Sequence, residues 1–357
     1  MYDFKKIIIN NIPLIDVRAP IEYNKGAFLN SVNLPIMQDD ERHEIGIEYK
    51  KNGNAAAIEL GHRLVSGNIR AERINSWIKF IEDNPNAVIY CFRGGQRSKI
   101  SKQWIAEANR DVERIEGGYK AFRTYLMEES KNINSSILIL AGYTGAGKTR
   151  VLDNINYAID LEKIANHRGS SFGRYVSKQP TQINFENNLA YAIIKHQHEN
   201  YKYMLLEDEG RHVGTNFIPR DLTQKFATGS MVVLDETLEH RLDITLNEYV
   251  CVAQEQYCAI TEDGLNDWAN YITESIQRLQ KRLGNTMVRE VVQMFDDAFS
   301  YQLKSGDIEA HKDWIECLLT NYYDPMYKYQ LEKNTMPILF RGNTREVTEY
   351  LLDLKIY

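Results

Sequence analysis

The chain has 357 residues, enough for two domains that each bury a core. Hydrophobic residues make up 43% and charged residues 26%, and the net charge of −6 excludes a globally basic nucleic-acid binder but not a local basic patch. No apolar run approaches the roughly 20 residues that cross a bilayer. The start, MYDFKKIIINNIP, does not resemble a signal peptide. We therefore expect a cytoplasmic protein with no membrane partner.

The first part of the chain alternates short apolar strands with helical segments. We expect a strand that ends at Asp16, helices within 55–83, and a buried strand over 86–91. A helix over 98–109 comes next, and then a strand, a glycine turn and a helix over 112–126. Such alternation predicts a parallel sheet.

The polar stretch SKNINSS at 130–136 is typical of a linker. In the part that follows, apolar strands are expected at 137–141, 203–209 and 230–236, the last two ending in acidic residues. After about residue 240 the pattern predicts helices to the end of the chain. The sequence thus predicts an α/β protein whose two domains, each with a parallel sheet, are 1–130 and 131–357, the second with a helical C-terminal region.

The four cysteines lie at positions 91, 251, 258 and 317, and their spacing matches no zinc pattern, so we predict no metal site. Cys91 differs from the others because it begins CFRGGQRS, between a buried strand and a helix. Glycines there let several backbone N–H groups converge on one atom, and the helix start and the arginines favour a thiolate nucleophile. The predicted catalytic residues are Cys91, Arg93, Gly94, Gly95 and Arg97.

Two chemistries share this arrangement of a cysteine and an arginine. Cys91, five intervening residues, Arg97 and Ser98 also spell the signature of cysteine-dependent phosphatases. Those enzymes usually carry a histidine before the cysteine, whereas this chain has Tyr90. DVRAPIEYNKGAFLNSVNLP (16–35) resembles the N-terminal half of a rhodanese domain, which implies that the cysteine carries sulfur or selenium. We favour the chalcogen carrier.

The segment GYTGAGKT matches the P-loop pattern GxxxxGK[ST] and follows the strand ILILA, as that motif requires. Backbone amides at the start of a helix, expected over 150–159, would surround a phosphate, and the lysine adds a positive charge. The predicted diphosphate-binding residues are Gly142, Thr144, Gly145, Ala146, Gly147, Lys148 and Thr149. The Thr149 hydroxyl can bind Mg²⁺, although lysine and arginine alone can also neutralise a diphosphate. The guanine-reading NKxD motif is absent.

Two polar loops, NHRGSSFGR (166–174) and EDEGRHVG (207–214), should fall at the carboxyl ends of strands, where an open α/β sheet binds its ligand. Their arginine and histidine residues suit a phosphorylated or RNA substrate. The predicted substrate-binding residues are His167, Arg168, Ser170, Ser171, Glu207, Asp208 and Arg211. Glu207, Asp208 and Asp235 are also candidates for an acid that binds Mg²⁺ next to the P-loop.

A rhodanese-like part followed by a P-loop part is an unusual pairing. CFRGGQRS, GYTGAGKT, NHRGSSFG, LEDEGRHVG and GDIEAHKDWIECLLTNYYDPMY, with their spacing, resemble the tRNA 2-selenouridine synthase family along nearly the whole chain. The resemblance implies a transferase that converts 2-thiouridine at the tRNA wobble position to 2-selenouridine. It further implies S-geranylation from geranyl diphosphate at the P-loop, then replacement of the geranylthio group by selenium from selenophosphate, with selenium carried on Cys91 as a perselenide.

The expected partners are the tRNA anticodon loop, selenophosphate and geranyl diphosphate, with no tightly bound cofactor. Tyr322, Tyr323, Tyr327 and Tyr329 are candidates for stacking on RNA bases, although tyrosines at helical spacing more often pack in a core. One alternative is a rhodanese-type sulfur carrier with a nucleotide-dependent P-loop switch domain. Another is a phosphatase with an accessory kinase-like domain.

Overall fold

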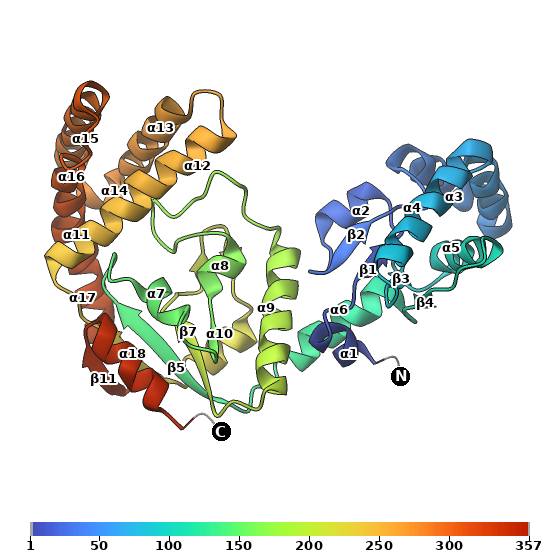
Figure 1. The fold of residues 1–357 in the computed structure, drawn as a ribbon, viewed down its shortest axis with the longest axis horizontal. Helices are drawn as coiled ribbons and strands as arrows, with labels where there is room; N and C mark the ends of the chain where they lie inside the picture. Colours follow the sequence, from blue (N-terminus) through green and yellow to red (C-terminus); the bar gives the residue numbers. More distant parts are fainter. Residues whose placement is uncertain (1–2, 356–357) are drawn as a thin grey trace. The chain divides into compact units, whose positions relative to one another are not determined.

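A computed structural model of the protein describes residues 3–355. The chain forms two compact units: the first takes in the chain up to Ile133 together with Thr181–Glu199, and the second takes in Asn134–Pro180 and the chain from Asn200 on (Figure 1). Each unit has a parallel sheet flanked by helices, which confirms the predicted α/β class.

The sheet of the first unit has four parallel strands in the order β2-β1-β3-β4. Its strands are β1 (Leu14–Asp16), β2 (Ser31–Asn33), β3 (Val88–Tyr90) and β4 (Glu113–Arg114). Its helices are α1 (Phe4–Ile9), α2 (Pro20–Lys25), α3 (Asp39–Leu64), α4 (Gly67–Asp83), α5 (Gln96–Glu107), α6 (Gly118–Glu129) and α9 (Gln182–His198). The strands predicted to end at Asp16 and to lie within 86–91 are confirmed.

Helix α3 begins at Asp39, well before the helices that the sequence predicted from residue 55. The helix is broken at Gly53, whose φ of 83° is readily adopted only by glycine. Ile45, before the break, packs against Gly61, after it. The two halves of α3 therefore fold back on each other as a helical hairpin.

Helix α9 belongs to the first unit although it lies between two parts of the second unit in the sequence. Its apolar residues Ala190, Tyr191 and Ile194 join the core that contains Phe28 and Phe122. The side chains of two asparagines on α9 bond to the backbone of Ala27, and Arg123 pairs with Glu186. The predicted division into domains 1–130 and 131–357 does not include this return of the chain to the first unit.

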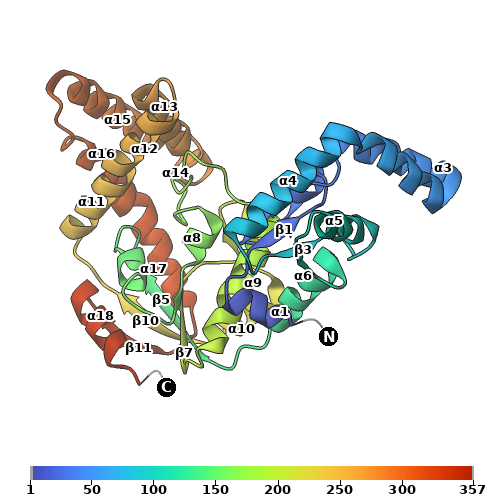
Figure 2. The ribbon, with the colours of Figure 1, turned by 45° about the vertical axis from the view of Figure 1, so that its right-hand side comes forward.

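The second unit has a five-stranded parallel sheet in the order β11-β10-β5-β7-β6 (Figure 2). The strands are β5 (Ser136–Gly142), β6 (Ala158–Ile159), β7 (Tyr203–Glu207), β10 (Ser230–Leu234) and β11 (Ile338–Gly342), with a separate antiparallel pair, β8 (His212–Val213) and β9 (Asn216–Phe217). Helices near these strands are α7 (Lys148–Leu152), α8 (Leu161–Ala165), α10 (Arg220–Phe226) and α18 (Thr344–Asp353).

Two predictions for this unit are wrong. The helix after the P-loop ends at Leu152 rather than near residue 159, because Ala158–Ile159 pairs with β7. The region after residue 240 is not helical to its end, because β11 pairs with β10 at the edge of the sheet. Strand β11 was missed since its residues are mostly exposed and lack the buried apolar run of the central strands.

The remaining helices pack around a separate core that contains Trp268, Phe295 and Trp314. They are α11 (Leu238–Leu246), α12 (Val252–Ile260), α13 (Gly264–Gln277), α14 (Gln280–Leu283), α15 (Asn285–Ser305), α16 (His311–Leu318) and α17 (Asp324–Lys333), with π-helical turns η1 (Asn247–Cys251) and η2 (Leu319–Tyr323) (Figure 1). Tyr322 and Tyr323 are buried, which favours packing over free stacking surfaces.

The role of α9 in the first unit can be tested at Asn187, which is fully buried. Its Nδ2 donates to the Ala27 carbonyl at 2.8 Å and its Oδ1 accepts from Arg123 Nη1 at 2.6 Å. Asn187→Ala leaves the buried Ala27 carbonyl without this donor and removes one acceptor of Arg123, so it should lower the free energy of unfolding of this unit by about 1–3 kcal/mol in urea titrations. The less buried neighbour Asn188→Ala is the control, and equal effects of the two substitutions would contradict the assignment.

Candidate functional site

Cys91 lies directly after β3, at the start of the loop that leads into α5, and is only 2% exposed. Its Sγ is 3.2 Å from Ser98 Oγ and 3.9 Å from the Gly95 carbonyl oxygen. The Ser98 hydroxyl is in turn 3.3 Å from the same carbonyl. The thiol therefore lies within the loop, in contact with the start of α5, and its contacts are with a carbonyl and a hydroxyl rather than with the predicted backbone N–H groups.

The loop is held by the glycine turn that precedes α6. Tyr119 N donates to the Cys91 carbonyl at 2.9 Å, and Lys120 N donates to the Phe92 carbonyl at 2.9 Å. A Cβ on Gly118 would lie 2.2 Å from the Cys91 carbonyl oxygen and 2.4 Å from Gly94 N, so no other residue fits there. Gly117-Gly118 thus fixes the position of the Cys91 backbone.

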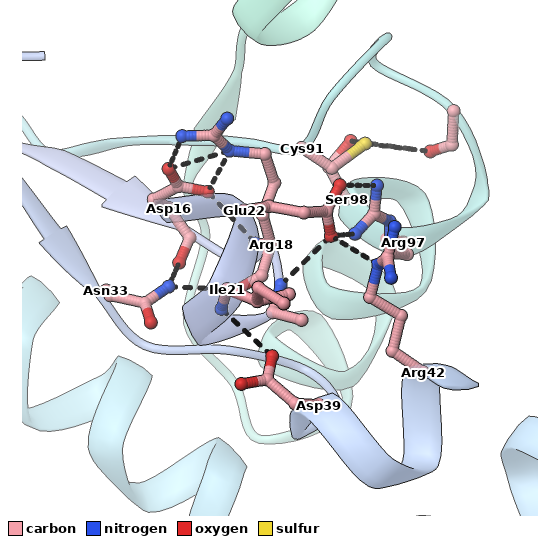
Figure 3. A network of polar contacts seen from close by, with 12 residues as sticks. Asp16, Arg18, Ile21, Glu22, Asn33, Asp39, Arg42, Cys91, Arg97 and Ser98 are labelled. Atoms are coloured by element: carbon pink, nitrogen blue, oxygen red, sulfur yellow. Dashed lines mark hydrogen bonds and ion pairs between the residues drawn. The ribbon is translucent and has the colours of Figure 1, made fainter. Parts of the chain in front are cut away.

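A buried ion pair supports the strand next to the cysteine loop. Arg18 Nη2 donates to Asp16 Oδ2 at 2.6 Å and to the Gly26 carbonyl at 2.8 Å, and the guanidinium lies 3.9 Å from the centre of the Tyr119 ring. Asn33 Nδ2 donates to the carbonyls of Asp16 and Arg18 (Figure 3). These contacts explain why the motif from Asp16 to Arg18 accompanies the cysteine loop.

Arg97 is engaged by a carboxylate rather than left free. Its two terminal nitrogens donate to Glu22 at 2.5 and 3.1 Å, and Arg42 Nε donates to the same carboxylate at 3.1 Å (Figure 3). Burial alone would raise the pKa of Glu22, but the hydrogen bond and charge of Arg97 outweigh it and leave this pKa below its ordinary value of 4.5. Sequence reasoning missed Glu22 as a site residue, although it belongs to the rhodanese-like motif.

A cavity of about 670 Å³ opens beside the thiol. Of the five predicted catalytic residues, Cys91, Arg93, Gly95 and Arg97 line it, and Gly94 supports the loop from behind through its contact with the glycine turn. Arg93 is exposed, which leaves its guanidinium available to an anionic ligand. The opposite wall comes from α3, which the sequence did not connect with the cysteine.

The P-loop connects β5 to α7 as predicted. Gly145 and Gly147 adopt φ values of 78° and 83°, which turn the backbone around a phosphate-sized space. Lys148 Nζ donates to the Gly142 carbonyl at 3.2 Å. Every predicted diphosphate-binding residue lines one cavity of about 680 Å³: Gly142, Thr144, Gly145, Ala146, Gly147, Lys148 and Thr149.

Arg241 on α11 holds the loop from the other side, a role that the sequence did not reveal. Its Nε donates to the Thr144 carbonyl at 3.0 Å, while its other nitrogens pair with Asp324 at 3.0 and 2.5 Å. The Arg241 side chain is only 4% exposed. Its hydrogen bonds are thus used to join the P-loop to the helical region, not to bind phosphate.

The structure divides the predicted substrate-binding residues into two groups. Those that line the P-loop cavity are Arg168, Ser170, Ser171 and Asp208. Those that are not among its lining residues are His167, Glu207 and Arg211. Arg211 is exposed, and Asp235 instead lies 3.4 Å from Arg341.

His167 and Glu207 have structural contacts. His167 Nδ1 accepts from Gly169 N at 3.1 Å, and burial lowers the pKa of this histidine to about 4. Glu207 is 2% exposed and accepts from Leu161 N, at the start of α8, at 2.8 Å. Burial raises the pKa of Glu207 well above its ordinary value, and the charge of Asp160 adds to this shift.

Two acidic residues that the sequence analysis did not select lie in the P-loop cavity. Burial raises the pKa of Glu209 to about 9, with a further contribution from the charge of Glu162, and burial also raises the pKa of Glu162. The positive charge of Lys148 opposes both shifts but does not cancel them. Burial and the neighbouring Glu162 thus raise the pKa of Glu209 and favour its neutral form, which limits the negative charge that a bound diphosphate would face.

Both π-helical turns contribute to the same cavity. Glu248 and Tyr249 come from η1, and Tyr322 and Tyr323 come from η2. Such turns change which side chains a helix presents and often occur at functional sites. Their placement here agrees with a binding role for the cavity, but no simple sequence pattern predicts them.

Comparison with known proteins bears on both units. Residues 135–356 match the family described as the tRNA 2-selenouridine synthase AAA domain, and residues 2–125 match the rhodanese-like domain. A tRNA 2-selenouridine synthase from Sulfurovum sp. (strain NBC37-1) is 48% identical over 99% of this chain and 98% of its own length. Those from Shewanella frigidimarina and Hydrogenovibrio crunogenus are each 44% identical over 98% of this chain, and over 96% and 97% of their own lengths.

The chain belongs to the tRNA 2-selenouridine synthase family. This confirms the family that the two loops and their order indicated. Residues 3–355 contain no group of three or more His, Cys, Asp or Glu side chains arranged to hold a metal ion. Within the same residues, no helix has the length and apolar character needed to cross a membrane.

The raised pKa of Glu209 leads to a prediction for ligand binding. As the pH rises through about 9, Glu209 ionises and adds a negative charge to the P-loop cavity. Pyrophosphate affinity, measured by calorimetry, should therefore fall more steeply with pH in the wild-type protein than in Glu209→Gln. Ionisation of pyrophosphate itself is common to both proteins and cancels in the comparison. Glu239→Gln, at an exposed position on α11, should behave as wild type; identical pH profiles for wild type and Glu209→Gln would refute the assignment.

The ion pair between Glu22 and Arg97 makes a prediction for stability. Because the folded-state pKa of Glu22 is depressed, its stabilisation is complete above the unfolded pKa and is lost as pH falls through the folded value. The free energy of unfolding should thus decline between about pH 5 and pH 3 more in wild type than in Glu22→Gln. Glu113→Gln, at an exposed position on β4, is the control. A decline of equal size in wild type and Glu22→Gln would count against the pair.

Proposed function

We propose that this protein converts 2-thiouridine at the wobble position of tRNA to 2-selenouridine, with selenophosphate as the selenium donor and geranyl diphosphate as a co-substrate. The observation that carries the proposal is that one chain of this family contains both a buried thiol in a closed loop and a fully formed P-loop cavity. Two loops of such different character suit two successive reactions, one at a diphosphate and one at a soft, chalcogen-bearing centre.

In the first reaction the C2 sulfur of 2-thiouridine attacks the allylic carbon of geranyl diphosphate. A C–S bond forms, the C–O bond to the diphosphate breaks, and the N3 proton passes to solvent. The P-loop residues from Gly142 to Thr149 bind the departing pyrophosphate through backbone amides and Lys148. Arg168, which also lines this cavity, adds a second positive charge.

In the second reaction the geranylthio group leaves C2 as selenium enters. The P–Se bond of selenophosphate is cleaved by water, which takes the phosphoryl group as phosphate. The C2–Se bond forms, the C2–S bond breaks, N3 regains a proton, and the geranylthiolate takes up a proton from solvent. Selenium in selenophosphate is already at the oxidation level of the product, so the exchange at C2 is a substitution and consumes no oxidant. We assign this step to Cys91, with the exposed Arg93 to attract the anionic donor.

The assignment of the two loops predicts opposite phenotypes for two variants. With 2-thiouridine-containing tRNA, geranyl diphosphate and selenophosphate, Lys148→Ala should lose geranylated product by about 100-fold or more, because it removes charge stabilisation of the leaving group. Cys91→Ala should still form geranylated tRNA but accumulate it without 2-selenouridine. Nucleoside mass spectrometry measures both products.

Cys258→Ala is the matched control, since Cys258 is an exposed cysteine of the second unit, and it should behave as wild type. Unmodified tRNA under all conditions with the wild-type protein would refute the proposal. Nucleotide hydrolysis independent of tRNA would then favour a sulfur carrier with a nucleotide-dependent switch. Release of phosphate from an aryl phosphate, lost in Cys91→Ala, would favour a phosphatase.

A further inference from the structure

We propose that the cavity beside Cys91 binds the prenyl chain of the S-alkylated nucleoside, so that the first unit recognises its substrate by the leaving group. This inference rests on the proposed function, because it requires an S-prenylated intermediate. It goes beyond that function in assigning the intermediate's apolar tail to a defined wall of the rhodanese-like unit, formed by α3.

The cavity is lined mostly by aliphatic and aromatic side chains. They come from both halves of the α3 hairpin, from the residue after α3 and from α5: Ile45, Ile47, Ile58, Val65, Ile100 and Trp104. Its volume of about 670 Å³ is within the range of roughly 300–1,000 Å³ that small-molecule sites have. The space is therefore adequate for a branched hydrocarbon chain.

The cavity runs from a buried floor to an open rim. Cys91 and Trp104, 2% and 3% exposed, belong to the buried part, whereas Ile47 and Tyr49 are 53% and 57% exposed. Aliphatic surface left open to water next to a nucleophile is costly unless a ligand covers it. Lys50 and Arg93, both exposed, are charged groups at the open side and suit the polyanionic RNA to which the chain is attached.

The reaction proposed at Cys91 indicates which part of the reacting molecules the cavity binds. Selenophosphate is a small anion, and the uracil ring is polar on its edges, so neither gains from an aliphatic wall. The thioether leaving group is the apolar part of the reacting molecule. Binding it here places C2 next to the thiol loop, and when the C2–Se bond forms and the C2–S bond breaks, the prenylthiolate is already in an apolar space, where it takes up a proton.

The break at Gly53 brings the two halves of α3 to the same cavity. Without the break at Gly53, the C-terminal half of the helix could not return to lie against the first half. Ile47, from one half, and Ile58, from the other, would then not face the same cavity. A pocket for hydrocarbon is thus built by a single glycine in an otherwise polar helix.

The experiment uses the full-length protein, selenophosphate and three anticodon stem-loop RNAs that carry S-geranyl-, S-dimethylallyl- or S-methyl-2-thiouridine. Because the thioether sulfur is alike in all three, differences in rate report binding of the chain. Wild type should show kcat/KM that rises with chain length, by about tenfold or more from methyl to geranyl. Ile47→Asn and Ile58→Asn should bring this ratio close to one by slowing the geranyl substrate alone.

Leu29→Asn is the matched control, since Leu29 is also 53% exposed and on the same unit but does not line the cavity. It should keep the wild-type ratio, and activity on the S-methyl substrate shows that each variant is folded. Equal kcat/KM for the three RNAs in wild type, or an unchanged ratio in both cavity variants, would overturn this inference and leave the proposed function intact. Failure of wild type to incorporate selenium into any of them would overturn both.

Discussion

The contact between the cysteine loop and the glycine turn before α6 is the constraint on which the first unit depends. Two stretches of backbone meet so closely that a single Cβ at Gly118 would fall 2.2 Å from the Cys91 carbonyl oxygen. The two hydrogen bonds from Tyr119 and Lys120 require this approach. Because the backbone is held from one side, the Cys91 thiol can lie on the other, in contact with Ser98 and next to the cavity beside α3.

The second unit meets a different physical requirement, the control of charge. The proposed diphosphate ligand would bring several negative charges into a cavity that already contains Glu162, Asp208 and Glu209. Burial raises the pKa of all three carboxyls, so the cavity holds less negative charge than its composition suggests. Arg241 is used to join the P-loop to Asp324. The positively charged residues that line the cavity are Lys148, Lys163, Arg168 and Arg282.

Sequence reasoning succeeded where residues close together in the chain determine the local structure. The P-loop and the cysteine loop each need glycines, a preceding buried strand and a following helix within a few residues, and the structure has both as predicted. It failed where contacts between distant parts of the chain determine which element forms and where it packs. The core around Phe122 selects α9 from a distant part of the chain, and the exposed edge strand β11 owes its form to pairing with β10.

The same distinction applies to the site residues. Glu207 and Asp208 are adjacent and equally acidic, yet strand alternation turns Glu207 into the interior to hold α8 and leaves Asp208 in the cavity. Arg97 was predicted as a catalytic residue next to Cys91, but Glu22, 75 residues earlier, accepts hydrogen bonds from both of its terminal nitrogens. Composition reveals which chemistry a loop can support, whereas partners across the fold decide which of its side chains remain available.

The two cavities differ in the kind of leaving group that each suits in the proposed reactions. A diphosphate leaving group needs amides and a cation, and the P-loop cavity supplies Gly145, Gly147 and Lys148. A prenylthiolate leaving group needs a wall of hydrocarbon, and the α3 hairpin supplies Ile47 and Ile58. In the proposed reactions the two leaving groups therefore depart at separate sites, the diphosphate at the P-loop cavity and the prenylthiol at the cavity beside α3.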